Sequence, residues 1–558
     1  MNPMTMATES SSGRLLPLLA AALTLISATA ASASAPGVSG TSFNLTASPA
    51  YLTQPSGQMI YSWGYACSVP TGATAPTPVP AAITAPLTVC NGTMQVPGPT
   101  LVVTEGQTIS VTLTNNLPPA AGNTSILFPG LQLLSAGPAA GQPSSCTAAT
   151  PAPQGLLAVE AANGCAVTYR FLATTPGTRG YSSGTQGDLQ VEMGLYGAVI
   201  VLPATAPGPS DCPAHNLSAG LDTSAGALPG ALVANGEGDF RLGQWAYNHP
   251  KTCYDREYLF QFSEIDPNIH TQAQLQVAAK AGCVANAPGC SLNVPTEPYH
   301  PAYFMINGRS MPDDMDPNYT PQYPHQPYNG NPHMHPGDQV LLRIIGQGRW
   351  QHPFHEHGNH VRILARDGNL ILTPDGTGLA GPLLFTTTTT PGLAMDGIFY
   401  FTGRGLNWDM YGHNPDSGGA AALACTPDAN GYNTLGLAAG FINYYEWCQD
   451  HNKPIEAKPF GSVPGGGPAT LPDPGILRNG PWYGGSNYLG PDANRRAVGG
   501  TPIPPSGTIA NNPRTEAGYA FMWHSHNERE ITTNNIFPGG MLMMMLVDSR
   551  EFLIDESQ

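Results

Sequence analysis

The chain of 558 residues is too long for one compact core, and its length predicts two or three domains. Charged residues make up only 10% of it and hydrophobic residues 41%, and 65 glycines and 57 prolines break the apolar runs every few residues, a composition typical of all-β proteins. The net charge of −16 argues against nucleic acid or an anionic membrane surface as a partner.

The N-terminus has the features of a secretory signal peptide. Arg14 precedes a mostly apolar run at 15–30, and small residues at 31–35 then lead to Pro36. The apolar run is shorter than the roughly 20 residues that a membrane-spanning helix needs, and no later segment of the sequence approaches that length. We therefore expect residues 1–33 to be a signal peptide and the mature protein to be exported, periplasmic or secreted, with no membrane span.

A first domain is predicted over residues 42–206. Polar and apolar residues alternate at 108–114, which is the pattern of a half-buried strand. Other short strands are predicted at 59–65, 167–172 and 194–202. A loop-rich linker at 207–252 follows.

The second domain is predicted over residues 253–550. Its expected strands lie at 257–262, 303–308, 337–345, 361–365, 383–389, 397–402, 518–526 and 541–547, with one short helix at 271–281. Residues at about 407–514 are rich in Gly, Pro and Asn without periodicity, which predicts a surface insertion. The phrase T-T-P-G occurs in both halves, from Thr174 and from Thr389, and favours two related β-domains.

Ten cysteines agree with export, because an even number in an oxidising compartment favours disulfides. Sequence alone does not fix their connectivity. The simplest pairing joins neighbours along the chain: Cys67/Cys90, Cys146/Cys165, Cys212/Cys253, Cys283/Cys290 and Cys425/Cys448.

Two His-x-His pairs, His355/His357 and His524/His526, lie on predicted strands. Alternate residues of a strand point to the same face, so each pair offers two imidazoles to one side. Imidazole is a good ligand for copper, zinc, iron and nickel, and four histidines at this spacing favour a metal site over histidines that only form hydrogen bonds in a core. Glutamates near the pairs could accept hydrogen bonds from the ligating imidazoles, or could instead be exposed: Glu356, Glu528 and Glu530.

Two further groups of residues are weaker candidates for copper. His333-Met334-His335, with His325 nearby, combines imidazole and thioether ligands but is better explained as a loop. Met541 and the methionines at 543–545 are better explained as core packing on a closing strand.

Several phrases of the sequence resemble the multicopper oxidases. They are V-P-G-P-T-L-V-V-T-E-G from Val96, P-G-T-R-G-Y from Pro176, H-P-F-H-E-H-G from His352 and W-H-S-H from Trp523. The resemblance implies an all-β fold of two or three cupredoxin-like Greek-key β-sandwich domains, and copper as the cofactor.

In that family, four His-x-His pairs hold a trinuclear copper cluster. By resemblance, the third and fourth pairs correspond to His355, His357, His524 and His526. The positions of the first two pairs hold Leu127, Pro129, Ser182 and Gly184 instead. No histidine precedes His215, so the first domain has none to offer from elsewhere.

The family also binds a mononuclear blue copper through a Cys, two His and often a Met. Ser525 stands at the position of the Cys, and a hydroxyl cannot replace a soft thiolate in such a site. His352 matches one of the two histidines, Glu530 lies near the position of the other, and Met541 could be the axial ligand if the loop before it is longer than in the family. These three residues are possible additional metal ligands.

The sequence therefore predicts an exported, multicopper-oxidase-like protein that binds copper through two His-x-His pairs and lacks the usual four-electron oxidase reaction. Two alternatives remain open: a copper-dependent oxidoreductase with a rebuilt site, and a metal-free pseudoenzyme with an interaction or structural role. No catalytic residue and no oligomeric state can be assigned from the sequence.

Overall fold

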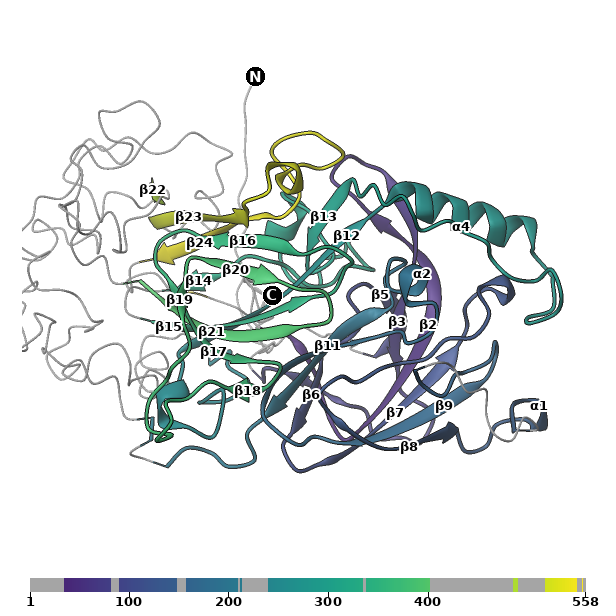
Figure 1. Cartoon of the computed structure of the whole chain (residues 1–558), viewed down its shortest axis with the longest axis horizontal. Helices are drawn as coiled ribbons and strands as arrows, with labels where there is room; N and C mark the ends of the chain where they lie inside the picture. Colours follow the sequence, from purple (N-terminus) through teal and green to yellow (C-terminus); the bar gives the residue numbers. More distant parts are fainter. Residues whose placement is uncertain are drawn as a thin grey trace, which may run out of the picture.

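The computed structural model describes residues 35–81, 90–147, 157–208, 211–212, 239–334, 338–401, 485–489, 517–548 and 554. Strands dominate this part of the chain, and they form four sheets (Figure 1). The all-β prediction is confirmed. The predicted signal peptide lies outside the described residues, and so does all of the predicted insertion except residues 485–489.

The first half of the chain forms two sheets around one apolar core. The order in the first is β10 (Gly177–Ser182), β11 (Tyr196–Leu202), β6 (Leu101–Thr104), β1 (Gly37–Ser39) and β4 (Thr77–Val79). The order in the second is β5 (Asn91–Gln95), β3 (Met59–Ser68), β2 (Ser42–Thr53), β7 (Thr108–Asn115), β9 (Ala166–Leu172) and β8 (Gln132–Pro138). In β7 the alternation predicted from the sequence is present, with Ile109, Val111 and Leu113 fully buried.

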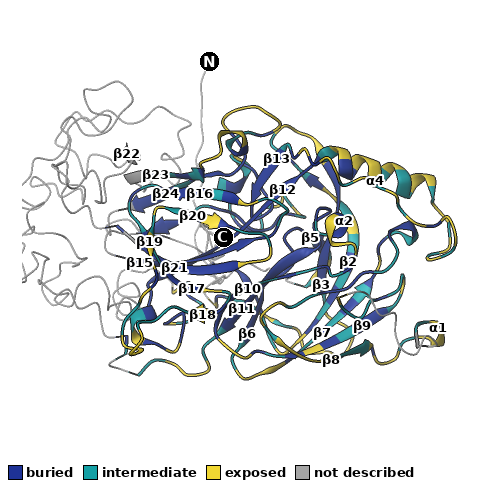
Figure 2. Cartoon of the chain, in the orientation of Figure 1, coloured by how far each residue is buried: buried dark blue, intermediate teal, exposed yellow. Residues whose placement is uncertain are grey.

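The second half forms two more sheets, which carry the candidate site. The first runs β13 (Tyr303–Ile306), β12 (Arg256–Ile265), β15 (Gln339–Gly346), β21 (Ala394–Tyr400), β17 (Val361–Arg366) and β18 (Asn369–Leu370), and β19 (Leu383–Leu384) also pairs with β17. The second runs β14 (His333–Met334), β24 (Leu542–Asp548), β23 (Ala517–Ser525), β16 (His352–Glu356) and β20 (Thr386–Thr389), and β22 (Gly485–Leu489) also pairs with β23. Figure 2 shows the central strands β12 and β15 buried along their whole length. The strand predicted at 383–389 is two strands in different sheets, because the chain changes sheet at Phe385.

Helices are few and short in the described part of the chain. The longest is α4 (Pro267–Ala279), which begins before the predicted residue 271 because Asp266 caps it, its side chain accepting a hydrogen bond of 2.9 Å from the Asn268 N–H. The others are α1 (Ser144–Thr147), α2 (Gly187–Gln190) and the 3-10 helices η1 (Pro119–Ala121), η3 (Pro250–Thr252), η4 (Asp313–Met315) and η11 (Glu528–Ile531). No described helix combines the length and the apolar character needed to cross a membrane.

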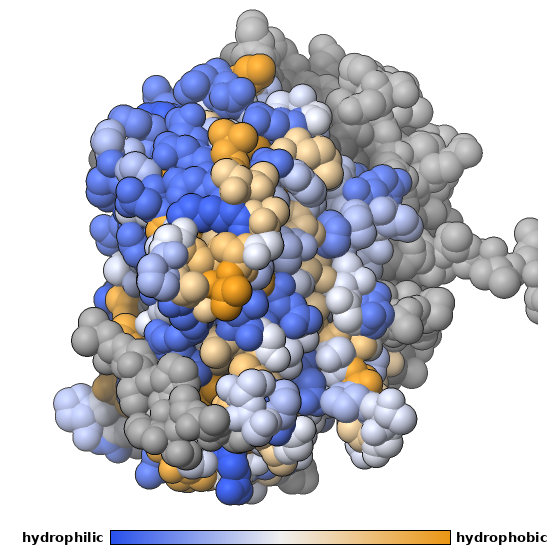
Figure 3. Space-filling view, turned by 90° about the vertical axis from the view of Figure 1, so that its right-hand side faces the viewer, coloured by the Kyte–Doolittle hydropathy of each residue, from blue (hydrophilic) through white to orange (hydrophobic). Residues whose placement is uncertain are grey.

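Four of the five predicted disulfides are confirmed: Cys67–Cys90, Cys146–Cys165, Cys212–Cys253 and Cys283–Cys290. Cys425 and Cys448 lie outside the described residues. On the face drawn in Figure 3, hydrophilic side chains surround small groups of apolar ones, as is ordinary for folded proteins.

A buried polar cluster joins the two halves. Asp396 of β21 accepts hydrogen bonds from the N–H (3.1 Å) and the hydroxyl (2.6 Å) of Thr178 in β10, and from the Tyr247 hydroxyl (2.5 Å). Arg343 lies beside it and forms a buried ion pair of 2.8 Å with Glu257. No described sheet mixes strands of the two halves, while the predicted domain boundaries, 42–206 and 253–550, stay predictions.

Candidate metal centre

The two His-x-His pairs meet where β16 and β23 run antiparallel: His355 and His524 lie in these strands, and His357 and His526 each follow the last residue of its strand. His355 of β16 lies directly opposite His524 of β23. On the other face of the same strands, Phe354 and Trp523 are fully buried in an apolar core. Because a strand alternates its side chains between two faces, burying these aromatic residues turns the histidines to the opposite face.

The four imidazoles form one cluster. The centroid of the His355 ring lies 4.8 Å from that of His357, 5.3 Å from that of His526 and 5.8 Å from that of His524. The His524 ring lies 5.2 Å from that of His357 and 5.7 Å from that of His526. The structure thus brings together all four of the predicted ligands. The two pairs are 167 to 171 residues apart in the sequence, and the pairing of β16 with β23 in the sheet brings them close.

Hydrogen bonds orient two of the rings. His524 Nδ1 lies 2.7 Å from the Ser525 carbonyl, which can only accept, so Nδ1 carries the proton and Nε2 keeps its lone pair in the neutral ring. His524 Nε2 lies 3.3 Å from His357 Nε2. His355 Nδ1 lies 3.0 Å from the Thr386 hydroxyl, so its Nε2 is the nitrogen directed away from that contact.

The surroundings favour the neutral form of two of the imidazoles, His355 and His524. The pKa of His355 is lowered to about 4, mainly by burial and also by the neighbouring His524 and His526, while a hydrogen bond to the Phe385 backbone opposes this shift. Burial also lowers the pKa of His524. Neutral imidazole is the form that binds metal, and His526 is exposed to solvent, so the cluster is accessible.

The donor atoms do not converge on a single point as they stand. Among the described residues, no group of three or more His, Cys, Asp or Glu side chains has the arrangement of a formed metal site. A tetrahedral metal with imidazole nitrogens at 2.0–2.1 Å separates those nitrogens by about 3.3 Å. The Nε2 atoms of His357 and His524 already have this spacing.

The three possible additional ligands lie in a separate place, on the core side of the same strands. His352 Nε2 lies 3.0 Å from Glu264 Oε2, and its Nδ1 lies 3.0 Å from Glu530 Oε2. Glu530 also accepts a 2.5 Å hydrogen bond from the Ser525 hydroxyl. Met541 is fully buried in the apolar core. Sequence reasoning missed Glu264, because it lies in β12 with no motif around it.

The predicted outer carboxylates have different surroundings. Glu356 is fully buried on the core face, opposite Trp523, where it accepts a hydrogen bond from Thr387 and burial raises its pKa to about 8. Glu528 is exposed. Glu530 contacts His352 and Ser525, as described above.

The weaker candidates do not form a copper site in the described residues. His333 and Met334 form the buried strand β14, so the prediction of a loop is wrong for them, and His335 lies outside the described residues. His325 Nδ1 bonds to the Met94 carbonyl of the first half at 2.7 Å. Met543 and Met545 are buried in the apolar core, as predicted.

The positions of the two absent histidine pairs also meet in space. Leu127 and Ser182 form an isolated antiparallel bridge, with the Leu127 N–H donating to the Ser182 carbonyl at 2.8 Å. A Cβ on Gly184 would lie 2.8 Å from Leu127, so these positions are closely packed. The segments are adjacent, as two ligand segments would be, but they carry no imidazole.

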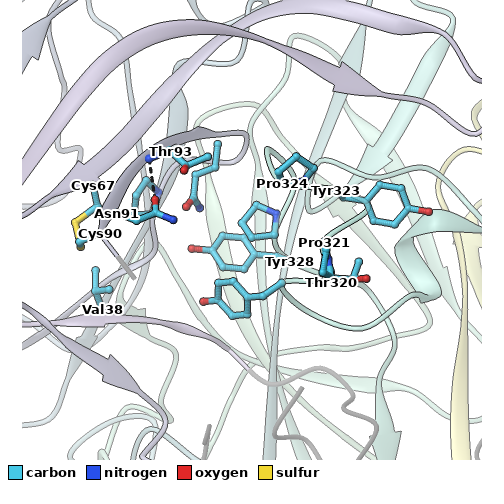
Figure 4. A pocket seen from close by; sticks show the side chains of 14 residues that line it. Val38, Cys67, Cys90, Asn91, Thr93, Thr320, Pro321, Tyr323, Pro324 and Tyr328 are labelled. Carbon is cyan, nitrogen blue, oxygen red and sulfur yellow. Dashed lines mark hydrogen bonds between the residues drawn. A yellow bond between two sulfur atoms is a disulfide. The ribbon is translucent and has the colours of Figure 1, made fainter. Parts of the chain in front are cut away.

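A cavity of about 280 Å³ lies elsewhere, where strand β5 of the first half meets the loop at 319–328 (Figure 4). Tyr319, Tyr323 and Tyr328 line it, together with several prolines and the Cys67–Cys90 disulfide. None of the predicted metal ligands lines this cavity, so it is separate from the histidine cluster.

The match to a known protein family falls in the first half of the chain. Residues 75–206 match the family model described as multicopper oxidase. This match identifies that segment as a multicopper oxidase domain. The resemblance seen in the sequence is thereby confirmed for this segment, and the multicopper oxidase family implies copper.

Comparison with curated proteins gives no match. Similar solved structures include the blue copper oxidase from Nitrosomonas europaea, at 15% identity, with 90% of this chain and 85% of that chain covered and a TM-score of 0.42. The multicopper oxidase mgLAC is 14% identical, with 92% and 88% covered and a TM-score of 0.41. The copper nitrite reductase from Nitrosomonas europaea is 15% identical, with 65% and 85% covered and a TM-score of 0.35. At such low scores these likenesses carry no argument, and the fold class rests on the sheets themselves.

Proposed function

We propose that this protein is an exported copper-binding protein that holds one copper ion through His355, His357, His524 and His526. The observation that carries the proposal is the pairing of β16 with β23, which sets His355 opposite His524 and gathers four rings with centroid separations of 4.8–5.8 Å. Four disulfides agree with an oxidising compartment.

The residues around the cluster are suited to holding copper. The depressed pKa of His355 keeps its imidazole unprotonated near neutral pH, which removes proton competition for the metal. The buried Trp523 donates a hydrogen bond of 2.8 Å to the His357 carbonyl and so restrains the backbone of a second ligand. Bound copper would supply one-electron redox chemistry and an affinity for small anions and oxygen species.

The proposal does not include the family's four-electron oxygen reduction. The ligands for the other half of the cluster are absent, because their positions hold Leu127, Pro129, Ser182 and Gly184. Ser525 removes the thiolate through which electrons would enter.

A metal-free role is the second candidate, because no group of three or more His, Cys, Asp or Glu side chains among the described residues has the arrangement of a formed metal site. Metal analysis of the exported protein, prepared with copper present, separates the two. We expect about one copper per chain in the wild type and loss of that copper in His355→Ala/His524→Ala.

His360→Ala is the matched control. His360 is half-buried at the end of the same strand region, and its ring packs on Phe385 without belonging to the cluster. A wild-type protein without copper would favour the metal-free role. A double variant with as much copper as the wild type would show that the copper is bound elsewhere and would contradict the proposal.

A further inference from the structure

A second polar cluster lies behind the histidine pairs. We call it the buried carboxylate network; it consists of Glu264, His352, Ser525 and Glu530. Their exposed fractions are 2%, 0%, 0% and 1%. The network spans the two sheets of the second half, because Glu264 belongs to β12 in one sheet, while His352 and Ser525 belong to β16 and β23 in the other.

His352 lies between two carboxylates. Its Nε2 forms a 3.0 Å hydrogen bond with Glu264, and its Nδ1 makes a 3.0 Å ion-pair contact with Glu530 rather than a well-aligned hydrogen bond. Both ring nitrogens therefore face acceptors. Although burial lowers the pKa of His352, the two carboxylates outweigh that effect and raise the pKa to about 9.

Both carboxylate oxygens of Glu530 also accept hydrogen bonds from neighbouring side chains. Glu530 Oε2 accepts from the Ser525 hydroxyl at 2.5 Å, and Oε1 accepts from the Asn527 side-chain amide at 2.9 Å. The Ser525 hydroxyl oxygen in turn accepts from the Asn527 N–H at 3.2 Å. Ser525 lies between His524 and His526, so this end of the network restrains the chain that presents two of the four imidazoles.

The Glu264 end is anchored in both halves of the protein. Glu264 Oε1 accepts from the backbone N–H groups of Arg349 (2.5 Å) and Trp350 (2.7 Å) and lies 3.3 Å from the Tyr299 hydroxyl. That hydroxyl also lies 2.6 Å from Glu192 of the first half. The carboxylates of Glu264 and Glu530 are thus each held in place by several hydrogen-bond donors.

The residues of this network do not fit a mononuclear copper. By resemblance, His352 and Ser525 stand where such a copper would be held, Glu530 lies near the position of the second histidine, and Met541 could be the axial ligand only if the loop before it is longer than in the family. No thiolate is present, the Ser525 hydroxyl donates to Glu530, and both nitrogens of His352 face carboxylates. In place of a thiolate and free imidazole nitrogens, this position holds a hydroxyl and an imidazole that are already engaged by carboxylates.

We propose that the buried carboxylate network takes the structural place of the mononuclear copper: it joins the two sheets behind the histidine strands without a metal and leaves no copper site at this position. Removing one partner of a buried charge network leaves the others uncompensated, so the fold should depend on His352 even when no metal is present. This inference stands independently of copper binding by the four histidines, because it concerns different residues and a metal-free property.

The first test restores the missing thiolate. Ser525→Cys, loaded with copper, should bind no more copper per chain than the wild type and should lack the intense visible absorption of a copper–thiolate bond, because Glu264 and Glu530 retain His352. A blue protein, or one additional copper per chain, would overturn the proposal.

The second test measures thermal unfolding in the presence of a chelator. His352→Gln should lower the midpoint by roughly 5 °C or more, whereas the control His526→Gln, an exposed histidine of the copper cluster, should leave it nearly unchanged. If His352→Gln unfolds at the wild-type midpoint under chelation and only loses stability gained from copper, then His352 is a metal ligand and the proposal is wrong.

Discussion

The depressed pKa of His355 makes the stability of the metal-free protein depend on pH in a defined direction. The folded protein binds a proton at His355 only near pH 4, whereas the unfolded chain binds it near 6.5. Between these values the unfolded state holds more protons, so stability rises with pH. The contribution of His355 to the free energy of unfolding is fully present above pH 6.5 and is lost as the pH falls toward 4.

The size of this pH dependence of stability follows from the shift in the pKa of His355. A fall from 6.5 to about 4 corresponds to at most about 3 kcal/mol for an isolated buried group. His355 shares its surroundings with other imidazoles, and water reaches the cluster at His526, so screening reduces the expected contribution to about 1–2 kcal/mol.

The assay is denaturant unfolding of chelated protein at several pH values between 4 and 7.5, for the wild type and His355→Gln. The difference in unfolding free energy between the two proteins should shift in favour of the wild type by about 1–2 kcal/mol from pH 4 to pH 7. A difference that stays constant with pH, or moves the opposite way, would refute the assignment of a low pKa to His355.

Two further predictions follow from buried contacts. Asp396→Ala leaves the donors of Thr178 and Tyr247 without their acceptor, so we expect the protein to lose about 3–5 kcal/mol in denaturant unfolding; a loss below about 1 kcal/mol would contradict the role of this cluster in joining the halves. Trp523→Phe keeps an aromatic ring in the core but removes the donor to the His357 carbonyl, so copper titration should show roughly tenfold weaker binding, and unchanged affinity would contradict that restraint.

Much of the fold could be predicted because its signals are local. Alternation in β7, the turn residues between strands and the order of the cysteines are all read within short segments, and each agrees with the structure where it is described. The strand predicted at 383–389 is wrong because its division between two sheets depends on packing partners far away in the chain. Helix α4 begins at Pro267, before the predicted residue 271, because the Asp266 side chain caps the helix there and the apolar pattern does not mark this start.

For the candidate site, too, the local features could be predicted from the sequence and the long-range contacts could not. The His-x-His pairs are visible in the sequence because strand periodicity alone puts both imidazoles of a pair on one face. Glu264 is invisible there: it lies in a continuous buried strand, 88 residues from His352, and only the packing of two sheets brings them together. The sequence therefore indicated that a thiolate was missing at Ser525, but not what had replaced the metal.

X-ray absorption at the copper edge, on the copper-loaded wild-type protein, tests the central claim most directly. The proposal predicts imidazole nitrogen ligands at about 2.0 Å and no sulfur ligand, with the copper signal lost in His355→Ala/His524→Ala. A sulfur ligand, or the same copper spectrum in the double variant, would show that the metal lies somewhere other than the four histidines.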